Sequence, residues 1–331
     1  MRTPPPPPGG RPGAFPGAGT LAALSFVSIW ATFILLSRFA LGGSFTVAEL
    51  LFLRLAPAAL VLAPVMIRKG VIPKGQSWPR ALTIMLGAGI GFPAVVIAGL
   101  KVAPASDAGP LAPGTLPFWT ALATAVMMGE RPGPRRLFGL GLIFVGALLV
   151  GVWGAVSGAE PGAWRGHIGF VTAAALWAVY TVVFRQSGLS PLHAAAIGMF
   201  WSTVFGLPIL LWIGLPFDGA APVEIAVMGL LQGVLISVVA LLAYGYAVQV
   251  IGASEAGAFG ALTPILTLLG GVFLLDEPFG PAKVAGVCLV AAGVLFASGV
   301  FSRRAPAPEE AARETRLRRR RRAGRTGPGA R

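Results

Sequence analysis

The sequence predicts an all-α integral membrane protein, in which ten transmembrane helices form two inverted repeats of five helices each. First, 55% of its 331 residues are hydrophobic and only 11% are charged, against about 25% charged residues in soluble domains. Second, apolar runs of membrane-spanning length recur along the chain, with glycine and proline inside them. Third, the second half of the chain repeats the first.

The spans follow from the length of the apolar runs. Each run is near the ~20 residues that a helix needs to cross ~30 Å of hydrocarbon. A β-barrel would need alternating polarity, which these runs lack. The expected helices cover 20–41, 46–67, 80–100, 105–128, 135–154, 166–186, 192–214, 223–249, 254–275 and 281–300.

The repeat relates residues 20–154, the first five-helix repeat, to residues 166–300, the second. Because each repeat holds an odd number of spans, the second enters the membrane with reversed polarity. The halves are then related by a pseudo-two-fold axis in the membrane plane, as in secondary transporters. The matched pairs are Asp107 with Glu255, at an offset of 148 residues, and, at an offset of 147, Trp30 with Trp177, Arg38 with Arg185, Pro117 with Pro264, Glu130 with Glu277 and Gly146 with Gly293.

The segments outside the repeats are polar or rich in proline and glycine. Residues 1–19 have almost nothing apolar to bury, so we expect disorder there, as in the Arg-rich tail 302–331. Lysine and arginine gather in alternate loops, which predicts a cell-membrane protein with both termini in the cytoplasm. The run Arg318–Arg322 should attract anionic lipid, at about 1 kcal/mol per charge. No aromatic platform accompanies these charges, so we expect no nucleic-acid partner.

Two motif copies carry a resemblance to a known family. They read ASDAG…LAP..LPFWTALATAVMMGE and ASEAG…LTPILTLLGGVFLLDE, and LFLRLAPAALVL surrounds Arg54 in the second helix. Over about residues 20–300 the chain resembles the paired EamA domains of the drug/metabolite transporter superfamily. The resemblance implies a ten-helix exporter or importer of small metabolites, with a central cavity lined by both halves. Its substrates range from amino acids to drugs and nucleotide sugars, so the solute stays open; we take export as the working direction.

Pro117 and Pro264 lie half way along the fourth and ninth helices. A proline inside a helix has no N–H to donate and clashes with the carbonyl four residues back. Thr115 and Thr263 lie beside these breaks and could supply hydroxyls. The breaks therefore form either a midplane solute site with a bending point, or packing kinks whose freed carbonyls are satisfied by threonine.

Asp107 and Glu255 begin the same two helices, on opposite sides of the membrane. In the first turn of a helix, the helix dipole stabilises a carboxylate by about 0.3–1 kcal/mol, which is one reason for their presence. The other interpretation is a pair of proton-coupling or gating carboxylates, one at each mouth.

Arg54 is the basic residue well inside a predicted span, where an arginine costs about 2.5–3.5 kcal/mol. It could snorkel to the outer surface. Glu49 is five residues back and on a different helix face, so it is a poor partner. Arg54 then either anchors an anionic or carboxylate solute, or makes a structural hydrogen bond to helix ends.

Gln232 and two aromatic helix faces complete the candidate solute site. An unpaired amide in hydrocarbon is costly, so Gln232 should face the interior, for the solute or for a helix–helix hydrogen bond. Tyr244 adds polarity to the same helix. Aromatic faces can line a cavity for apolar, aromatic or cationic solutes, or can simply pack. These faces hold Trp30, Phe33 and Ser37 in the first half and Trp177, Tyr180 and Phe184 in the second.

The remaining charged residues have structural explanations. Arg38 and Arg185 end helices, where cations complement the dipole. Glu130 and Glu277 should cap the following helix or pair locally with Arg131, Arg135 or Lys283. Small residues at 256–261 permit close helix packing and leave a homodimer open.

The function expected is secondary-active transport of small organic metabolites, amino acids or drugs by alternating access. No GxxxxGK[ST] loop indicates an ATPase, and no HExxH or GxSxG motif indicates an enzyme. The histidines, His167 and His193, fall at helix edges on opposite sides, and there is one cysteine, Cys288. We therefore expect no enzyme activity, metal or cofactor. A non-transporting membrane scaffold or receptor with the same fold is the alternative.

Overall fold

The computed structural model describes residues 16–72, 75–156 and 161–300. Within those ranges the chain is helical, without strands, and forms ten candidate membrane spans, which confirms the predicted fold class. The helices are α1 (Pro16–Gly42), α2 (Val47–Lys69), α3 (Trp78–Ala88), α4 (Gly91–Leu100), α5 (Ala105–Leu111), η1 (Pro113–Thr115), α6 (Leu116–Met128), α7 (Pro134–Val156), α8 (Ala163–Ser187), α9 (Pro191–Ile213), α10 (Pro222–Gly229), η2 (Leu230–Val239), α11 (Ala240–Ile251), α12 (Ala253–Phe259), α13 (Leu262–Leu275) and α14 (Pro281–Ser298).

Two sequence predictions fall outside what the structure describes. Residues 1–15 of the expected disordered N-terminus lie outside the described residues. The Arg-rich tail from residue 301 on, with Arg318–Arg322, lies outside them as well. Disorder of residues 1–15 and of the tail therefore stays a prediction, whereas residues 16–19 form the start of α1 and were wrongly predicted as disordered.

Four spans are interrupted where the sequence predicts single helices, namely the third, fourth, eighth and ninth. Between α3 and α4 the Ile90 amide donates to Ser202 Oγ at 2.8 Å, a side-chain partner from α9. Pro113 and Pro117 lack the N–H groups that would continue α5 into α6. The eighth span contains the π-helical segment η2. Because matched spans are interrupted in both halves, these irregularities belong to the repeated unit.

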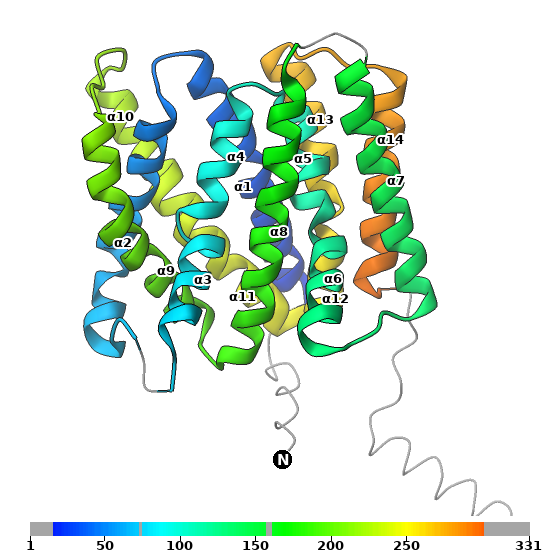
Figure 1. Ribbon diagram of the computed structural model, residues 1–331, viewed down its shortest axis with the longest axis horizontal. Helices are drawn as coiled ribbons and strands as arrows, with labels where there is room; N and C mark the ends of the chain where they lie inside the picture. The colour runs from blue at the N-terminus through cyan, green and yellow to red at the C-terminus, as the bar shows by residue number, and fades with distance from the viewer. Residues whose placement is uncertain (1–15, 73–74, 157–160, 301–331) are drawn as a thin grey trace, which may run out of the picture. The chain divides into compact units, whose positions relative to one another are not determined.

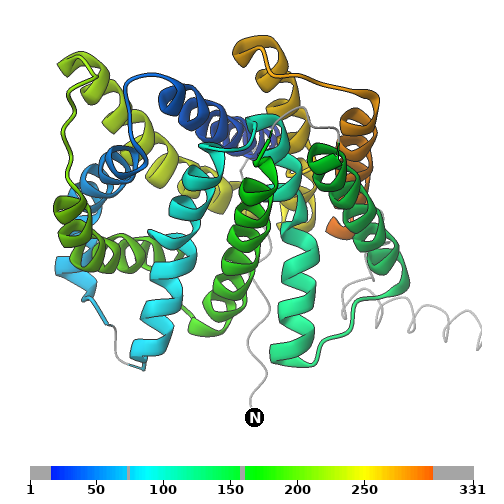
Figure 2. The same ribbon diagram turned by 45° about the horizontal axis from the view of Figure 1, so that its top comes forward.

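The pair α7 and α14 shows the inverted symmetry most directly. The two helices lie side by side in both views (Figures 1 and 2) and run antiparallel. A Cβ placed on Gly139 would lie 2.7 Å from the Gly293 oxygen, and one on Gly146 would lie 2.6 Å from the Gly286 oxygen. Gly139 matches Gly286 and Gly146 matches Gly293 at the offset of 147, so each contact is the two-fold image of the other.

Large apolar side chains cover the outward faces of several helices. Trp212 is 88% exposed, and Phe138 and Phe205 are also exposed. Phe33, Ile97 and Phe170 are buried between the helices. Large side chains exposed on long apolar helices are typical of lipid contact, which supports a multi-pass membrane protein.

Candidate functional site

Aromatic rings from four helices form a continuous chain, which we call the aromatic chain. Trp30 lies at its centre, 5.0 Å from the Trp177 ring and 5.7 Å from the Phe92 ring. These helices come from both halves of the repeat, so the chain crosses between them. In order, its members are Tyr244 of α11, Phe26 and Trp30 of α1, Phe92 of α4, and Trp177, Tyr180 and Phe184 of α8.

The aromatic chain therefore includes four residues predicted to contact solute, namely Trp30, Trp177, Tyr180 and Tyr244. Tyr244 is 36% exposed, whereas Tyr180 is buried. Ring separations of 4.7 to 5.8 Å are those of favourable aromatic pairs, so the chain stabilises helix packing as well.

A buried polar cluster adjoins the same face of α1. Gln232 of η2 is fully buried and donates from Nε2 to Ser37 Oγ at 2.9 Å. Arg54 of α2 is directed at the Gln232 Oε1 atom, at 3.4 Å, and its guanidinium lies over the Phe33 ring. Among the described residues Arg54 makes no bond to a helix end, and Glu49 accepts from the Thr46 and Phe217 amides. Gln232 thus faces the interior, as predicted, and bonds across helices.

The two proline breaks pack against each other. A Cβ placed on Gly114 would lie 3.3 Å from the Pro264 ring. Thr115 and Thr263 are buried, and the Thr115 hydroxyl donates to the Leu111 oxygen at 2.7 Å. The carbonyl four residues before Pro117, that of Pro113, accepts from the Leu116 amide and not from a threonine. A role for these residues in solute binding stays a prediction.

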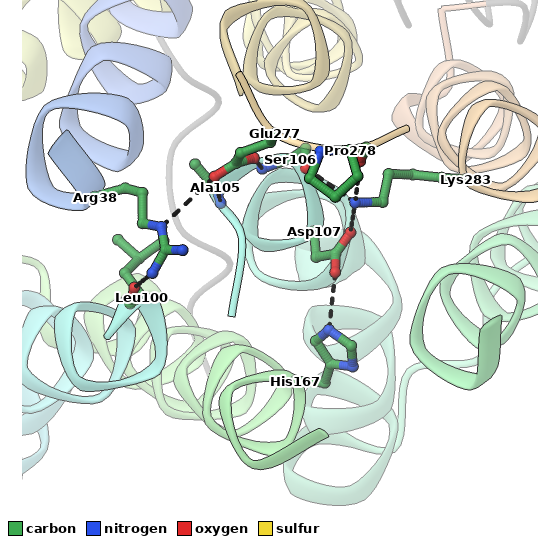
Figure 3. Close-up of polar contacts among 9 residues, drawn as sticks. All are labelled: Arg38, Leu100, Ala105, Ser106, Asp107, His167, Glu277, Pro278 and Lys283. Atoms are coloured by element: carbon green, nitrogen blue, oxygen red, sulfur yellow. Dashed lines mark hydrogen bonds and ion pairs between the residues drawn. The ribbon is translucent and has the colours of Figure 1, made fainter. Parts of the chain in front are cut away.

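Asp107 lies in a buried ionic cluster at the end of the bundle where α5 begins, which we call the α5 end. Its Oδ1 atom is 2.8 Å from Lys283 Nζ, and its Oδ2 atom is 3.0 Å from His167 Nε2 (Figure 3). Lys283 also donates to Ser106 Oγ at 3.1 Å. His167 and Lys283 belong to the second half, so the cluster joins the two halves.

Glu277 closes the same end and corrects one sequence prediction. Its carboxylate accepts from the Ala105 and Ser106 amides at 2.7 and 2.8 Å, so it caps α5 in the other half and not the following helix (Figure 3). Arg38 Nε lies 3.7 Å from Glu277 and its Nη1 donates to the Leu100 oxygen at 2.7 Å. Helix α1 continues to Gly42 and its last turn holds no basic residue, so the predicted dipole role of Arg38 is wrong. Arg38 instead holds helix ends together across the bundle.

The opposite end of the bundle, the α12 end, carries the matched residues in a different arrangement. Arg185 and Glu130 lie 3.6 Å apart, and their side chains are 49% and 50% exposed. In the matched pair Arg38 and Glu277 these values are 30% and 5%. Glu255, the counterpart of Asp107, is also exposed.

Matched glycines show the same difference in helix packing. A Cβ on Gly109 of α5 would overlap Thr267 Oγ1 of α13, so the two helices touch at this point. The counterpart Gly257 of α12 has no such neighbour within 4 Å among the described residues. Thr120 of α6 is the counterpart of Thr267, and α6 and α12 are not packed together.

Five residues in the aromatic chain and the Asp107 cluster were not predicted from the sequence as site members: Phe26, Phe92, Ser106, His167 and Lys283. Phe26 precedes Trp30 by four residues, so helical spacing could have added it to the aromatic face. His167 was predicted at a helix edge and Lys283 as a possible local partner of Glu277, and no local pattern links either residue to Asp107.

Comparison with known proteins assigns the fold to a family. The model of the EamA-like transporter family matches residues 17–152 and again residues 164–299. The two matches cover most of the chain and coincide with the two inverted halves. The chain belongs to the EamA-like transporter family. In this EamA-family protein the Asp107 cluster and the aromatic chain are both built from the two family domains together.

Relatives of this EamA-family protein are named as transporters. The uncharacterized transporter YyaM of Bacillus subtilis (strain 168) is 28% identical over 256 residues, 75% of this chain and 83% of the relative. A probable terminal-alkyne amino-acid exporter of Streptantibioticus cattleyicolor is 28% identical over 280 residues, 82% of this chain and 90% of the relative. A solved structure titled only "Crystal structure of protein" has a TM-score of 0.58 at 20% identity, covers 85% of this chain and 98% of its own, and shares the fold. The family and the names of these relatives point to a membrane transporter rather than to an enzyme.

Proposed function

We propose that this EamA-family protein is a secondary-active transporter that moves a small organic solute across the cell membrane by alternating access. Export is the working direction. The placement of lysine and arginine supports an orientation with both termini and the α12 end in the cytoplasm. In that orientation the closed α5 end faces outward and the structure corresponds to an inward-facing state.

The observation that carries this proposal is that matched residues touch at one end of the bundle and are apart at the other. Gly109 touches Thr267 at the α5 end, whereas Gly257 and Thr120 are apart at the α12 end. Two inverted halves can exchange their conformations, and the exchange produces the second state of the cycle. In that state Gly257 meets Thr120, Glu130 caps α12 and Arg136 approaches Glu255, while the α5 end opens.

The solute contacts that we propose lie between these two ends. They comprise the aromatic chain, with Trp30, Trp177, Tyr180 and Tyr244, the buried pair of Arg54 and Gln232, and the breaks at Thr115, Pro117, Thr263 and Pro264. The name of the Streptantibioticus relative supports amino acids among the solutes to test. Asp107 and Glu255 act as gating or proton-coupling carboxylates at the two mouths.

Disulfide crosslinking tests the two states directly. In a Cys288→Ser background, one protein carries Gly109→Cys with Thr267→Cys and the other carries Gly257→Cys with Thr120→Cys. Cysteines crosslink when their Cα atoms come within about 4.4–6.8 Å. We expect both pairs to crosslink in native membranes, and each crosslink to stop transport. Failure of the Gly257–Thr120 pair to crosslink under any condition contradicts alternating access and favours a static scaffold or receptor.

Flux in vesicles tests coupling separately. Uptake and efflux are measured for amino acids, organic acids and cationic drugs, with and without a proton gradient. Coupling through Asp107 and Glu255 predicts flux that depends on the gradient. Flux that ignores the gradient leaves the carboxylates with gating alone.

A further inference from the structure

Arg54 is a buried cation for which the described residues supply no counter-ion. It is 7% exposed, and no carboxylate of the described chain lies within ion-pair distance. Its hydrogen bond from Nη1 to Gln232 is long, at 3.4 Å, and its Nε atom is buried without an acceptor. A guanidinium has five N–H donors, so most of the donor capacity of Arg54 is unused.

A purely structural role does not account for this arrangement. A buried charge without a partner is costly, so structural arginines are normally paired with carboxylates or several carbonyl groups. The repeat does not require the charge either, because the matched position in the second half is Trp201, whose Nε1 donates to the Val71 oxygen. The unused donors of Arg54 therefore indicate a partner that is not part of this chain.

Gln232 and Phe33 orient the guanidinium. The Gln232 side-chain nitrogen donates to Ser37, so the side-chain oxygen is turned towards Arg54. The main-chain oxygen of Gln232 accepts from Ser237 Oγ at 2.8 Å within η2, and π-helical segments occur frequently at functional sites. The Phe33 ring lies 4.5 Å from the guanidinium carbon and covers one face of it. The edge of the fork, which includes Nε, stays unpaired.

We infer that Arg54 binds the carboxylate of the solute, whose apolar or aromatic body lies along α1 against Trp30 and the aromatic chain. This inference rests on the proposed transport function. The planar guanidinium fork matches a carboxylate in a bidentate pair. Trp30 precedes Phe33 by one helical turn, about 4.5 Å along α1, so one small molecule can reach both groups.

The same geometry separates solutes by charge. The described residues around Arg54 offer a cation, an amide, a hydroxyl and aromatic rings, and they offer no carboxylate for an ammonium group. Organic acids with one carboxylate and an apolar body should therefore bind without needing an amino group. Cations of the same shape should bind poorly.

Binding of matched solutes to the purified full-length protein in lipid nanodiscs tests this inference. The probes are 3-phenylpropanoate, its neutral amide and the cation 3-phenylpropylamine. A panel of further carboxylate–amide pairs covers other sizes of the apolar body, and calorimetry measures the affinity of each probe. We expect carboxylates to bind at least about tenfold tighter than their amides, and the amine to bind weakest. Arg54→Gln should make carboxylate and amide bind equally. Arg165→Gln is the control, since Arg165 also lies over a ring, that of Trp164, but away from this site.

Two outcomes overturn the inference. One is the absence of a carboxylate preference across the panel in the natural protein, and the other is a preference that survives Arg54→Gln. If Arg54→Gln does not fold, Arg54→Met, which also removes the charge, replaces it, and an unchanged preference in that variant also overturns the inference. The crosslinks at Gly109 and Gly257 need no solute, so they can succeed while the carboxylate site fails, which separates the two proposals.

Discussion

The α5 end and the α12 end are built from the same repeated sequence, and they differ in how that sequence is used. At the α5 end Glu277 is buried and caps a helix of the opposite half. At the α12 end its counterpart Glu130 is half exposed and makes an ion pair with Arg185. The repeat therefore supplies matching groups at both ends, and the packing of this structure brings them together at the α5 end.

The two ends also differ chemically. The buried cluster of Asp107, His167 and Lys283 has no equivalent composition at the other end, where Thr20 matches His167 and Arg136 matches Lys283. At the α5 end one carboxylate contacts both a histidine and a lysine. The stability of this cluster depends on all three side chains. We expect this difference to favour closure of the α5 end when no solute is bound.

Removing Lys283 should give the largest difference in stability between matched variants of the two ends. Lys283→Met leaves Asp107 buried with His167 alone, and loss of one partner of a buried ion pair costs about 3–5 kcal/mol. Arg136→Met, at the exposed counterpart, should change stability by less than about 0.5 kcal/mol. Thermal unfolding of the purified proteins measures both. The double variant Lys283→Met/Asp107→Asn should regain most of the loss, and equal melting temperatures for Lys283→Met and Arg136→Met contradict the role of the cluster.

Filling the matched glycines should have the next largest effect, in opposite directions. Gly109→Val forces a side chain into Thr267, and overpacking of about 1–3 kcal/mol shifts the two-state equilibrium about 5- to 150-fold towards an open α5 end. Gly257→Val fits this conformation and should block closure of the α12 end. Maleimide labelling of cysteines placed at each end reports the shift. Both variants should lose transport, and labelling that moves in the same direction for both would refute the exchange of states.

Neutralising Glu277 and Glu130 should give a smaller difference in stability between the two ends. Glu277→Gln keeps the shape of the side chain but weakens two charge-assisted bonds to backbone amides, at a cost of about 1 kcal/mol. Glu130→Gln should cost almost nothing in this conformation, because exposed ion pairs contribute about 0–1 kcal/mol. Labelling at the α5 end should rise for Glu277→Gln alone.

Salt should produce the smallest effect. The exposed pair Arg185–Glu130 is screened by ions, whereas the buried cluster around Asp107 is screened much less. Raising the ionic strength from about 0.01 M to about 1 M shortens the screening length from about 30 Å to about 3 Å. Labelling at the α12 end should change slightly with salt, and labelling at the α5 end should not. A larger response at the α5 end would mean that its cluster is open to water.

Much of the fold was predictable from the sequence because the membrane limits the choices. The ten spans follow from run length, and the interior position of Gln232 follows from the cost of an unpaired amide. The aromatic faces around Trp30 and Trp177 were predicted separately, and the two rings pack edge to face at 5.0 Å. Long-range partners were not predictable, because Glu277 meets Ala105 and Asp107 meets His167 only after the halves are packed.

The number of spans and their inverted relation can be read from the sequence alone, because hydrocarbon thickness sets helix length and an odd number of spans reverses the second copy. The packing of the helices shows which end is closed and that Arg54 is buried with no counter-ion among the described residues. Matched side chains are present at the α5 end and at the α12 end, but the energy of each contact depends on distances that helix packing sets.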